Sequence, residues 1–342
     1  MFRGMFDFIN TNKVYNDSEK TWWVELQQTD CIWYDMLLSP PDEIDTRHMV
    51  LGRIQQVEKL LKDNFEKRFI YFLCSRKKVR FATQKKPHYS LINKNLIIYL
   101  LIGKDNIRKK LSIPVLSYVN GKVIKTTPKV RVTEKYIYLN ISPSNTLVYS
   151  VHDFLKEHNI KLGLFSEVHY VGYTKNPQSR PTNGIHRGVM EMFYKHSNDD
   201  NDFFIHFHLF SPKVCATNND YNVNFTIANA VIDEIEIDKE GRIIEKCFIK
   251  YFNTEIQKLN LEKEKQELSR NLGDMLEKHK IKDISIDLQY KKPNEYFTYY
   301  SKSVECSGSH FFHVKREEGD VYIDRKAERE VYFKKLLNNE AI

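Results

Sequence analysis

Short apolar runs of strand character recur along this chain and alternate with segments of helical periodicity. The clearest runs are rich in β-branched, aromatic and aliphatic residues and cover 69–74, 91–101, 113–119, 130–142 and 203–210. Helical spacing of apolar residues marks 47–64, 151–159, 185–196, 242–258, 261–280 and 325–337. This mixture predicts an α/β or α+β protein in which helices flank a mixed sheet.

A length of 342 residues is enough for two or three hydrophobic cores. We expect an N-terminal α+β domain over 1–125, a compact unit over 126–260, and a C-terminal helix with a small α+β extension over 261–342. Within the compact unit, we expect a strand over 231–237 and a turn at 239–241. Asn120-Gly121 predicts a hairpin.

The charge of the chain is moderately basic, with 53 Lys+Arg against 45 Asp+Glu and a net charge of +8. Such a balance favours an anionic partner, of which nucleic acid is the commonest. A lysine-rich composition without specific meaning is the alternative explanation. We expect DNA as the partner, and the charge does not separate DNA from RNA.

Cysteine usage and hydropathy predict a cytoplasmic protein that does not enter a membrane. The five cysteines are scattered and form no C-x-x-C pair, which argues against a disulfide framework and a thiolate zinc site. The longest apolar segment, Leu96 to Ile102, is too short to span a bilayer. We expect no signal peptide, because residues 1–10 lack a charged region followed by a long apolar run.

One basic run is a candidate for contacts with phosphates. It comprises Arg76, Lys77, Lys78 and Arg80, and Lys85-Lys86 and Lys109-Lys110 add to it. Contacts of this kind give affinity without sequence choice. A solvated loop between two strands is the alternative.

The stretch 168–187 contains residues that handle phosphate and protons. It is expected to form a strand that ends in Tyr170-Val171-Gly172, followed by a loop to Arg180 and then His186. A glycine directly after the tyrosine leaves room for a close approach of backbone or ligand.

Glu245 is the candidate acid of the helix predicted over 242–258. On a helical wheel it falls inside the apolar arc, near Phe248 and Phe252, while Lys246 lies opposite. A carboxylate aimed towards a core needs an arginine or a divalent cation as partner. A glutamate of the first turn that reaches solvent is the alternative.

The order of these residues resembles the GIY-YIG nuclease superfamily over about residues 130–260. Tyr170-Val171-Gly172 ends the strand, Thr174 stands two positions later, and Arg180 follows after six more residues. Glu245 then lies on a helix that is followed by Leu259-Asn260, and Gln257 stands nearer to where the family has its asparagine. No Gly-Ile-Tyr half stands about ten residues before Tyr170, and Tyr149 and Tyr138 are the candidates for the missing strand.

The resemblance implies a GIY-YIG-like mixed sheet and the hydrolysis of DNA with Mg²⁺ or Mn²⁺. In this reading Tyr170 positions or deprotonates water, Arg180 binds the phosphate, His186 moves a proton, and Glu245 holds the metal. Residues expected to contact nucleic acid are Thr174, Lys175, Arg187 and Asn260, besides the basic run.

The resemblance also suggests a role in restriction or in defence against phage, and a homodimer or higher oligomer for cutting both strands. Two alternatives stay open. One is a nuclease fold that binds nucleic acid without cleaving it, since the first tyrosine half is not found. The other is a transition-metal site at His206 and His208, which alternate on one strand, although packing is the commoner role of such histidines.

Overall fold

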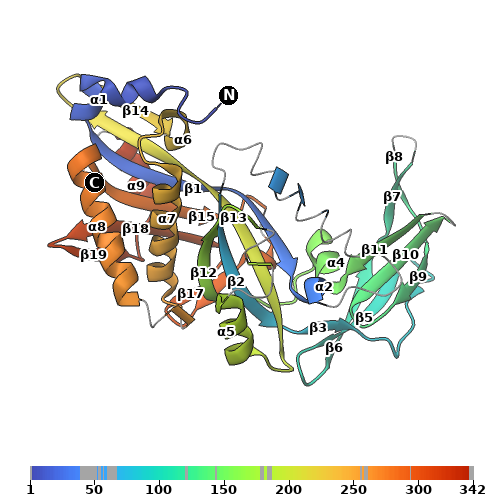
Figure 1. The fold of residues 1–342 in the computed structure, drawn as a ribbon. Helices are drawn as coiled ribbons and strands as arrows, with labels where there is room; N and C mark the ends of the chain where they lie inside the picture. The colour runs from blue at the N-terminus through green and yellow to red at the C-terminus, as the bar shows by residue number, and fades with distance from the viewer. Residues whose placement is uncertain are drawn as a thin grey trace.

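One large mixed sheet runs through the molecule and takes strands from most of the length of the chain (Figure 1). The computed structural model describes residues 2–38, 52, 55–56, 58–59, 68–119, 122–142, 145–177, 181–182, 187–254, 256–257, 261–292 and 294–338. Within them the fold is mixed α+β with a curled sheet and flanking helices, as the sequence pattern predicts.

The strand order of the large sheet is β17-β16-β12-β2-β13-β1-β15-β18-β19, and β14 pairs with the end of β13. Its two longest strands, β1 (Glu19–Trp33) and β13 (Asn201–Asn218), pair antiparallel at the centre and are largely buried. The other strands are β2 (Phe69–Lys77), β12 (Ser166–Thr174), β14 (Val223–Ala228), β15 (Ile281–Gln289), β16 (Tyr299–Ser301), β17 (Val304–Ser307), β18 (Ser309–Glu317) and β19 (Asp320–Asp324).

This sheet combines strands from the three regions expected from the sequence. β1 and β2 come from 1–125, β12 to β14 from 126–260, and β15 to β19 from 261–342. β1, for example, lies between β13 and β15. The boundaries at 125 and 260 therefore do not separate one sheet from another.

The helices α5 and α7 distinguish the two faces of the sheet around β2. Phe72 of β2 contacts Phe248 of α7 (Ile237–Phe252), with ring centroids 5.3 Å apart. Tyr71 points the other way, because successive side chains of a strand alternate between faces. That second face is covered by α5 (Arg187–His196). We call the two sides the α7 face and the α5 face.

The remaining helices lie on both faces and at the ends of the sheet. α8 (Leu261–His279) packs beside α7. α9 (Arg329–Asn338) lies against β18 through Tyr332 and Phe311, on the side opposite α7, since the neighbouring Phe312 contacts Phe248 of α7. At the far end of β13, η1 (Asp7–Thr11), α1 (Lys13–Asp17) and α6 (Asn229–Ile232) gather near β14 (Figure 1). The short helix α2 (Asp35–Leu38) follows β1, and the short 3₁₀ helix η3 (Glu295–Phe297) precedes β16.

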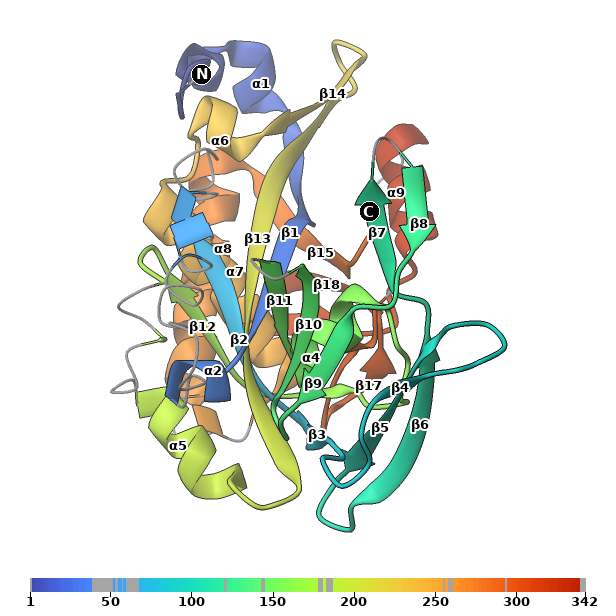
Figure 2. The same ribbon diagram turned by 90° about the vertical axis from the view of Figure 1, so that its right-hand side faces the viewer.

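The chain between β2 and β12 forms a smaller module at one side of the large sheet (Figures 1 and 2). We call residues 78–161 the inserted module. One of its sheets contains β3 (Val79–Phe81), β4 (His88–Tyr89), β5 (Leu96–Ile102) and β6 (Ile107–Ile113). The others are the hairpin of β7 (Leu116–Val119) and β8 (Lys122–Lys125), and the sheet of β9 (Lys129–Val132), β10 (Tyr136–Ser142) and β11 (Asn145–Ser150), followed by α4 (Val151–Glu157).

Two local predictions are wrong. Residues 231–237, expected as a strand, comprise the end of α6, a turn and the start of α7. Residues 239–241, expected as a turn, lie inside α7. The Asn229 side chain bonds both backbone groups of Ile235, and Asp233 adopts a left-handed φ of 48°, so the chain turns there. The helix predicted over 47–64 lies mostly outside the described residues, and the turn predicted at Asn120-Gly121 lies wholly outside them.

Candidate functional site

The predicted tyrosine strand lies directly beside a second tyrosine. In the antiparallel pair of β12 and β2, Tyr170 is opposite Leu73 and Gly172 is opposite Tyr71. The rings of Tyr71 and Tyr170 stack at 6.0 Å between centroids. A Cβ atom on Gly172 would lie 2.2 Å from Cζ of Tyr71, so only glycine fits at this position. Tyr71 is fully buried and Tyr170 is half-buried.

Neither tyrosine proposed for the missing first strand lies beside Tyr170. Tyr149 is on β11 and Tyr138 on β10, both in the three-stranded sheet of the inserted module. The strand beside Tyr170 is β2, which carries Ile70-Tyr71. The inserted module separates β2 from β12 in the chain, so a search about ten residues before Tyr170 does not reach it.

Gln257 closes the open edge of β12 at Val171. Its side-chain oxygen accepts from the Val171 N–H at 3.0 Å, and its side-chain nitrogen donates to the Val171 carbonyl at 2.8 Å. Thr254 donates to the same side-chain oxygen at 2.7 Å. β16 pairs only with Ser166 and Glu167, so this amide takes the place of a neighbouring strand next to Tyr170.

Glu245 lines a shallow pocket at the end of β12. The pocket measures about 540 Å³, and its lining comprises Tyr173, Thr174, Lys175, Asn176, Asp238, Arg242, Glu245, Lys246 and Glu267. Glu245 is half-buried rather than enclosed in the core. The structure thus brings together three predicted site residues, namely Glu245, Thr174 and Lys175.

Three cationic side chains, including Arg242, and three carboxylates line this pocket. Lys175 pairs with Asp238, which also accepts from the Tyr173 hydroxyl at 2.6 Å. These two donors lower the pKa of Asp238. Lys246, expected opposite the apolar arc, is buried between α7 and α8 and pairs with Glu264 and Glu267.

The buried acid of α7 is Glu240, which the sequence reading placed in a turn. It is fully buried, pairs with Arg68, accepts from Arg3 Nη2 at 2.7 Å and accepts from the Asn229 amide. The helix begins at Ile237 rather than near residue 242, which brings this first-turn residue under the large sheet. A helical wheel started five residues too late therefore selects Glu245 instead.

Tyr170 and helix α7 lie on opposite sides of the sheet. Tyr170 shares the α5 face with Tyr71, whereas Val171 shares the α7 face with Phe72. Glu245 reaches the Thr174–Asn176 turn at the end of β12 rather than the ring of Tyr170. Any ligand that contacts both side chains must pass around the end of this strand.

Three predicted site residues lie outside the described part of the chain: Arg180, His186 and Asn260. Arg187, the first residue of α5, is described. Its side chain is 75 % exposed and donates to Glu191 at 2.6 Å, which is an ordinary pair one helical turn apart.

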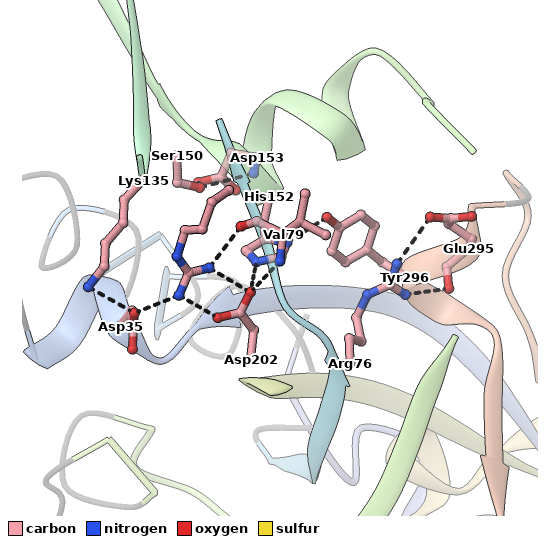
Figure 3. A network of polar contacts seen from close by, with 11 residues as sticks. Asp35, Arg76, Val79, Lys135, Ser150, His152, Asp153, Asp202, Glu295 and Tyr296 are labelled. Atoms are coloured by element: carbon pink, nitrogen blue, oxygen red, sulfur yellow. Dashed lines mark hydrogen bonds and ion pairs between the residues drawn. The ribbon is translucent and has the colours of Figure 1, made fainter. Parts of the chain in front are cut away.

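The basic run contains two arginines that are already paired, the buried Arg76 and the half-buried Arg80, which corrects their assignment as contacts to nucleic acid. Arg76 donates to the carboxylate and carbonyl of Glu295 and lies 3.8 Å from the ring centroid of Tyr296 (Figure 3). Arg80 donates to both oxygens of Asp202 at 2.8 and 2.9 Å. Lys77 and Lys78 are half-buried.

The carboxylate of Asp202, on β13, joins the inserted module to the large sheet. His152 of α4 contacts Asp202 through Nε2 and the Tyr296 hydroxyl through Nδ1, both at 2.8 Å (Figure 3). Burial lowers the pKa of His152. Burial alone would raise the pKa of Asp202, but hydrogen bonds from His152 and Arg80 lower it below its usual value. This network is structural, since its groups satisfy one another.

His206 and His208 are packing residues on the α7 face. The Tyr299 hydroxyl lies 3.0 Å from Nδ1 of His206, and the Thr29 hydroxyl lies 2.9 Å from Nδ1 of His208. Burial lowers the pKa of His208 to about 3. In the described part of the chain, no three metal-binding side chains of His, Cys, Asp or Glu gather in one place.

Glu245 fits a hard cation held by a single carboxylate. Mg²⁺ prefers oxygen ligands and commonly uses one or two carboxylates, with water and substrate phosphate completing its shell. Asp238 and Glu267 line the same pocket, but each is already paired with a lysine, Asp238 with Lys175 and Glu267 with Lys246, and Glu245 is the carboxylate proposed to hold the cation.

Comparisons with known proteins do not indicate a function, so the function has to be inferred from the geometry of the site. None of the described helices is long and apolar enough to cross a membrane. Neither a protein family model, nor a curated protein, nor a solved structure matches the chain.

Proposed function

We propose that this protein is a divalent-metal-dependent endonuclease of the GIY-YIG type that hydrolyses phosphodiester bonds of DNA. The observation that carries the proposal is the pair of strands β2 and β12, in which Ile70-Tyr71 lies against Tyr170-Val171-Gly172. Phe69-Ile70-Tyr71 supplies the half that is missing close to Tyr170, with Phe69 in place of the first glycine. The close contact of Tyr71 with Gly172 explains the need for that glycine.

Burial divides the work between the two tyrosines. Tyr71 is enclosed and supports the ring of Tyr170, while the half-buried Tyr170 positions and deprotonates the attacking water. An unperturbed phenol titrates near pH 10, so this role needs nearby positive charge. Arg180 contributes it with a guanidinium fork that also matches a phosphate. His186 accepts or holds a proton.

Glu245 would hold the metal. A bound Mg²⁺ or Mn²⁺ would stabilise the charge that develops on the leaving oxygen. Thr174 and Lys175 line the same pocket and orient the phosphate. Gln257 fixes the backbone of Val171 and thereby the position of its neighbour Tyr170.

Plasmid nicking tests the proposal. The purified chain with Mg²⁺ or Mn²⁺ is expected to convert supercoiled plasmid into nicked circles. Tyr170→Phe and Glu245→Gln should each slow nicking roughly 100-fold or more. Tyr194→Phe, on the exposed part of α5, is the matched control and should leave the rate unchanged. Equal rates for the wild type and both site variants, or an absence of nicks with either cation, would overturn the proposal.

A second candidate function, binding of nucleic acid without cleavage, is favoured by one observation. Tyr170 and helix α7 lie on opposite sides of the sheet, which separates the tyrosine from Glu245. In that case the wild type shifts the mobility of DNA in the presence of Mg²⁺ and leaves plasmid intact. The nicking assay and a mobility-shift assay on one preparation separate the two functions.

The proposed reaction has a consequence for the assembly, and the cysteines have one for the compartment. Cutting both strands needs two active sites, so we propose a homodimer or sequential nicking. None of the five cysteines forms a disulfide, which suits the reducing cytoplasm proposed for this protein.

A further inference from the structure

The net positive charge of the chain is concentrated in the inserted module. Residues 78–161 contain 16 Lys and Arg against 4 Asp and Glu, a net charge of +12. The whole chain has +8, so the remaining residues together carry −4. This asymmetry directs an anionic partner to one side of the molecule.

The four-stranded sheet of the module presents part of this charge on its outer face. Tyr99 of β5 pairs with Lys110 of β6, and Leu101 pairs with Arg108, so each pair shares a face. Nζ of Lys85 lies 4.6 Å from the ring centroid of Tyr99 on that side. His88 of β4 is opposite Ile97 and joins the same face. We call Lys85, His88, Arg108 and Lys110 the basic face (β5 and β6 are at the lower right in Figure 2).

The side chains of the basic face are available to a partner. Lys85, Arg108 and Lys110 are exposed and form no ion pair with any residue that the structure describes. Lys109, between the last two in the chain, points to the other side and donates to the Lys161 carbonyl at 3.4 Å. Apart from Lys109, that inner face of the sheet is mainly apolar and belongs to the core, with Leu100 fully buried.

We propose that the basic face binds the sugar–phosphate backbone of duplex DNA and holds the substrate of the nuclease. DNA binding by the basic face is independent of the proposed function, whereas the statement that this DNA is the substrate rests on it. Lys85 covers the ring of Tyr99, so this ring is not open for stacking on a base, and the contacts are with phosphates. Binding is therefore independent of base sequence and strongly dependent on salt.

Fluorescence anisotropy with a labelled 30-base-pair duplex tests this inference. The full-length chain carries Glu245→Gln throughout and is measured in EDTA, so that cleavage does not interfere. The triple variant Lys85→Glu, Arg108→Glu, Lys110→Glu should bind roughly 100-fold more weakly at 0.1 M salt. The slope of log K against log salt should fall in magnitude by about 2 to 3, because each lost phosphate contact contributes about 0.9.

The matched control is a triple variant with the same change in charge outside the module. Lys263→Glu, Arg270→Glu and Lys326→Glu replace exposed residues of α8 and of the turn before α9. This control should bind DNA within about twofold of the parent, since its sites lie away from the proposed contacts. Circular dichroism and urea unfolding of both triple variants verify that each remains folded.

The outcomes distinguish this inference from the proposed function. Equal affinity of both triple variants, or a loss confined to single-stranded RNA, would overturn the basic face as a DNA site, whatever the nicking assay shows. Selective weakening of duplex binding by the module variant supports it even if the wild type never nicks DNA. In that event the nuclease proposal fails and the binding site stands.

Discussion

Positive side chains have different surroundings in the large sheet and in the inserted module. In the large sheet, Arg68 and Arg76 are buried and paired with Glu240 and Glu295. In the module, Arg108 and Lys110 are exposed. The same residue types thus stabilise the fold at Arg68 and Arg76 and stay available to an anion on the basic face, although Arg80 of the module is also paired, with Asp202. Buried pairs affect stability when broken, whereas exposed basic residues affect affinity.

The largest effect is expected from the carboxylate that two arginines share. Glu240→Ala leaves Arg3 and Arg68 without their common partner, and an uncompensated buried charge costs about 3 to 5 kcal/mol. Urea unfolding monitored by circular dichroism measures this loss. The exposed Glu262 is the control, and Glu262→Ala should change the free energy of unfolding by less than about 0.5 kcal/mol. Equal losses for both variants would contradict the distinction.

A smaller loss is expected at Arg76, and it sharpens the comparison within one basic run. Arg76→Met removes the pair with Glu295 and the contact with the Tyr296 ring, and should lower the free energy of unfolding by about 3 kcal/mol. DNA affinity below the unfolding temperature should stay unchanged. Lys77→Met, at the next position, should leave stability within about 0.5 kcal/mol. If Arg76→Met weakened DNA binding without lowering the free energy of unfolding, Arg76 would be a contact to DNA after all.

Asp283 is an exception in the large sheet, because it is a buried acid without an arginine. Its Oδ1 atom has no hydrogen-bond partner among the described residues, and His313 Nε2 lies 3.8 Å from Oδ2. Burial raises the pKa of Asp283 to about 6. A raised native pKa means that stability from this group is present below pH 4 and is lost as the pH rises through 6.

Asp283→Asn therefore has an effect of opposite sign. The variant should be more stable than the wild type by about 3 kcal/mol at pH 8, and the difference should shrink towards zero at pH 4. Thermal unfolding at pH 4, 6 and 8 measures it. A wild type that is the more stable protein at pH 8 would show that the ionised carboxylate has a partner.

Local sequence patterns account for much of the secondary structure and for part of the site. The predicted strands at 69–74, 167–172 and 203–210 are present in β2, β12 and β13. The spacing of apolar residues also locates α4, α8 and α9. Periodicity records which side of an element is buried, and that is a local property of the chain. It located the start of α7 five residues late, and this shift selected Glu245 over Glu240 as the buried acid.

The amino-acid sequence by itself determined several of the strands and helices, the total charge and the presence of a Tyr-Val-Gly motif, although it did not reveal the central strand β1. Only the tertiary structure decided that Tyr71 lies against Gly172 and which lysines remain exposed. It also decided that Arg76 and Arg80 form ion pairs with the buried acids Glu295 and Asp202. The physical reason is that these facts depend on pairings between residues about 100 or more positions apart. Such pairings follow from how strands register and faces pack, and no local pattern encodes them.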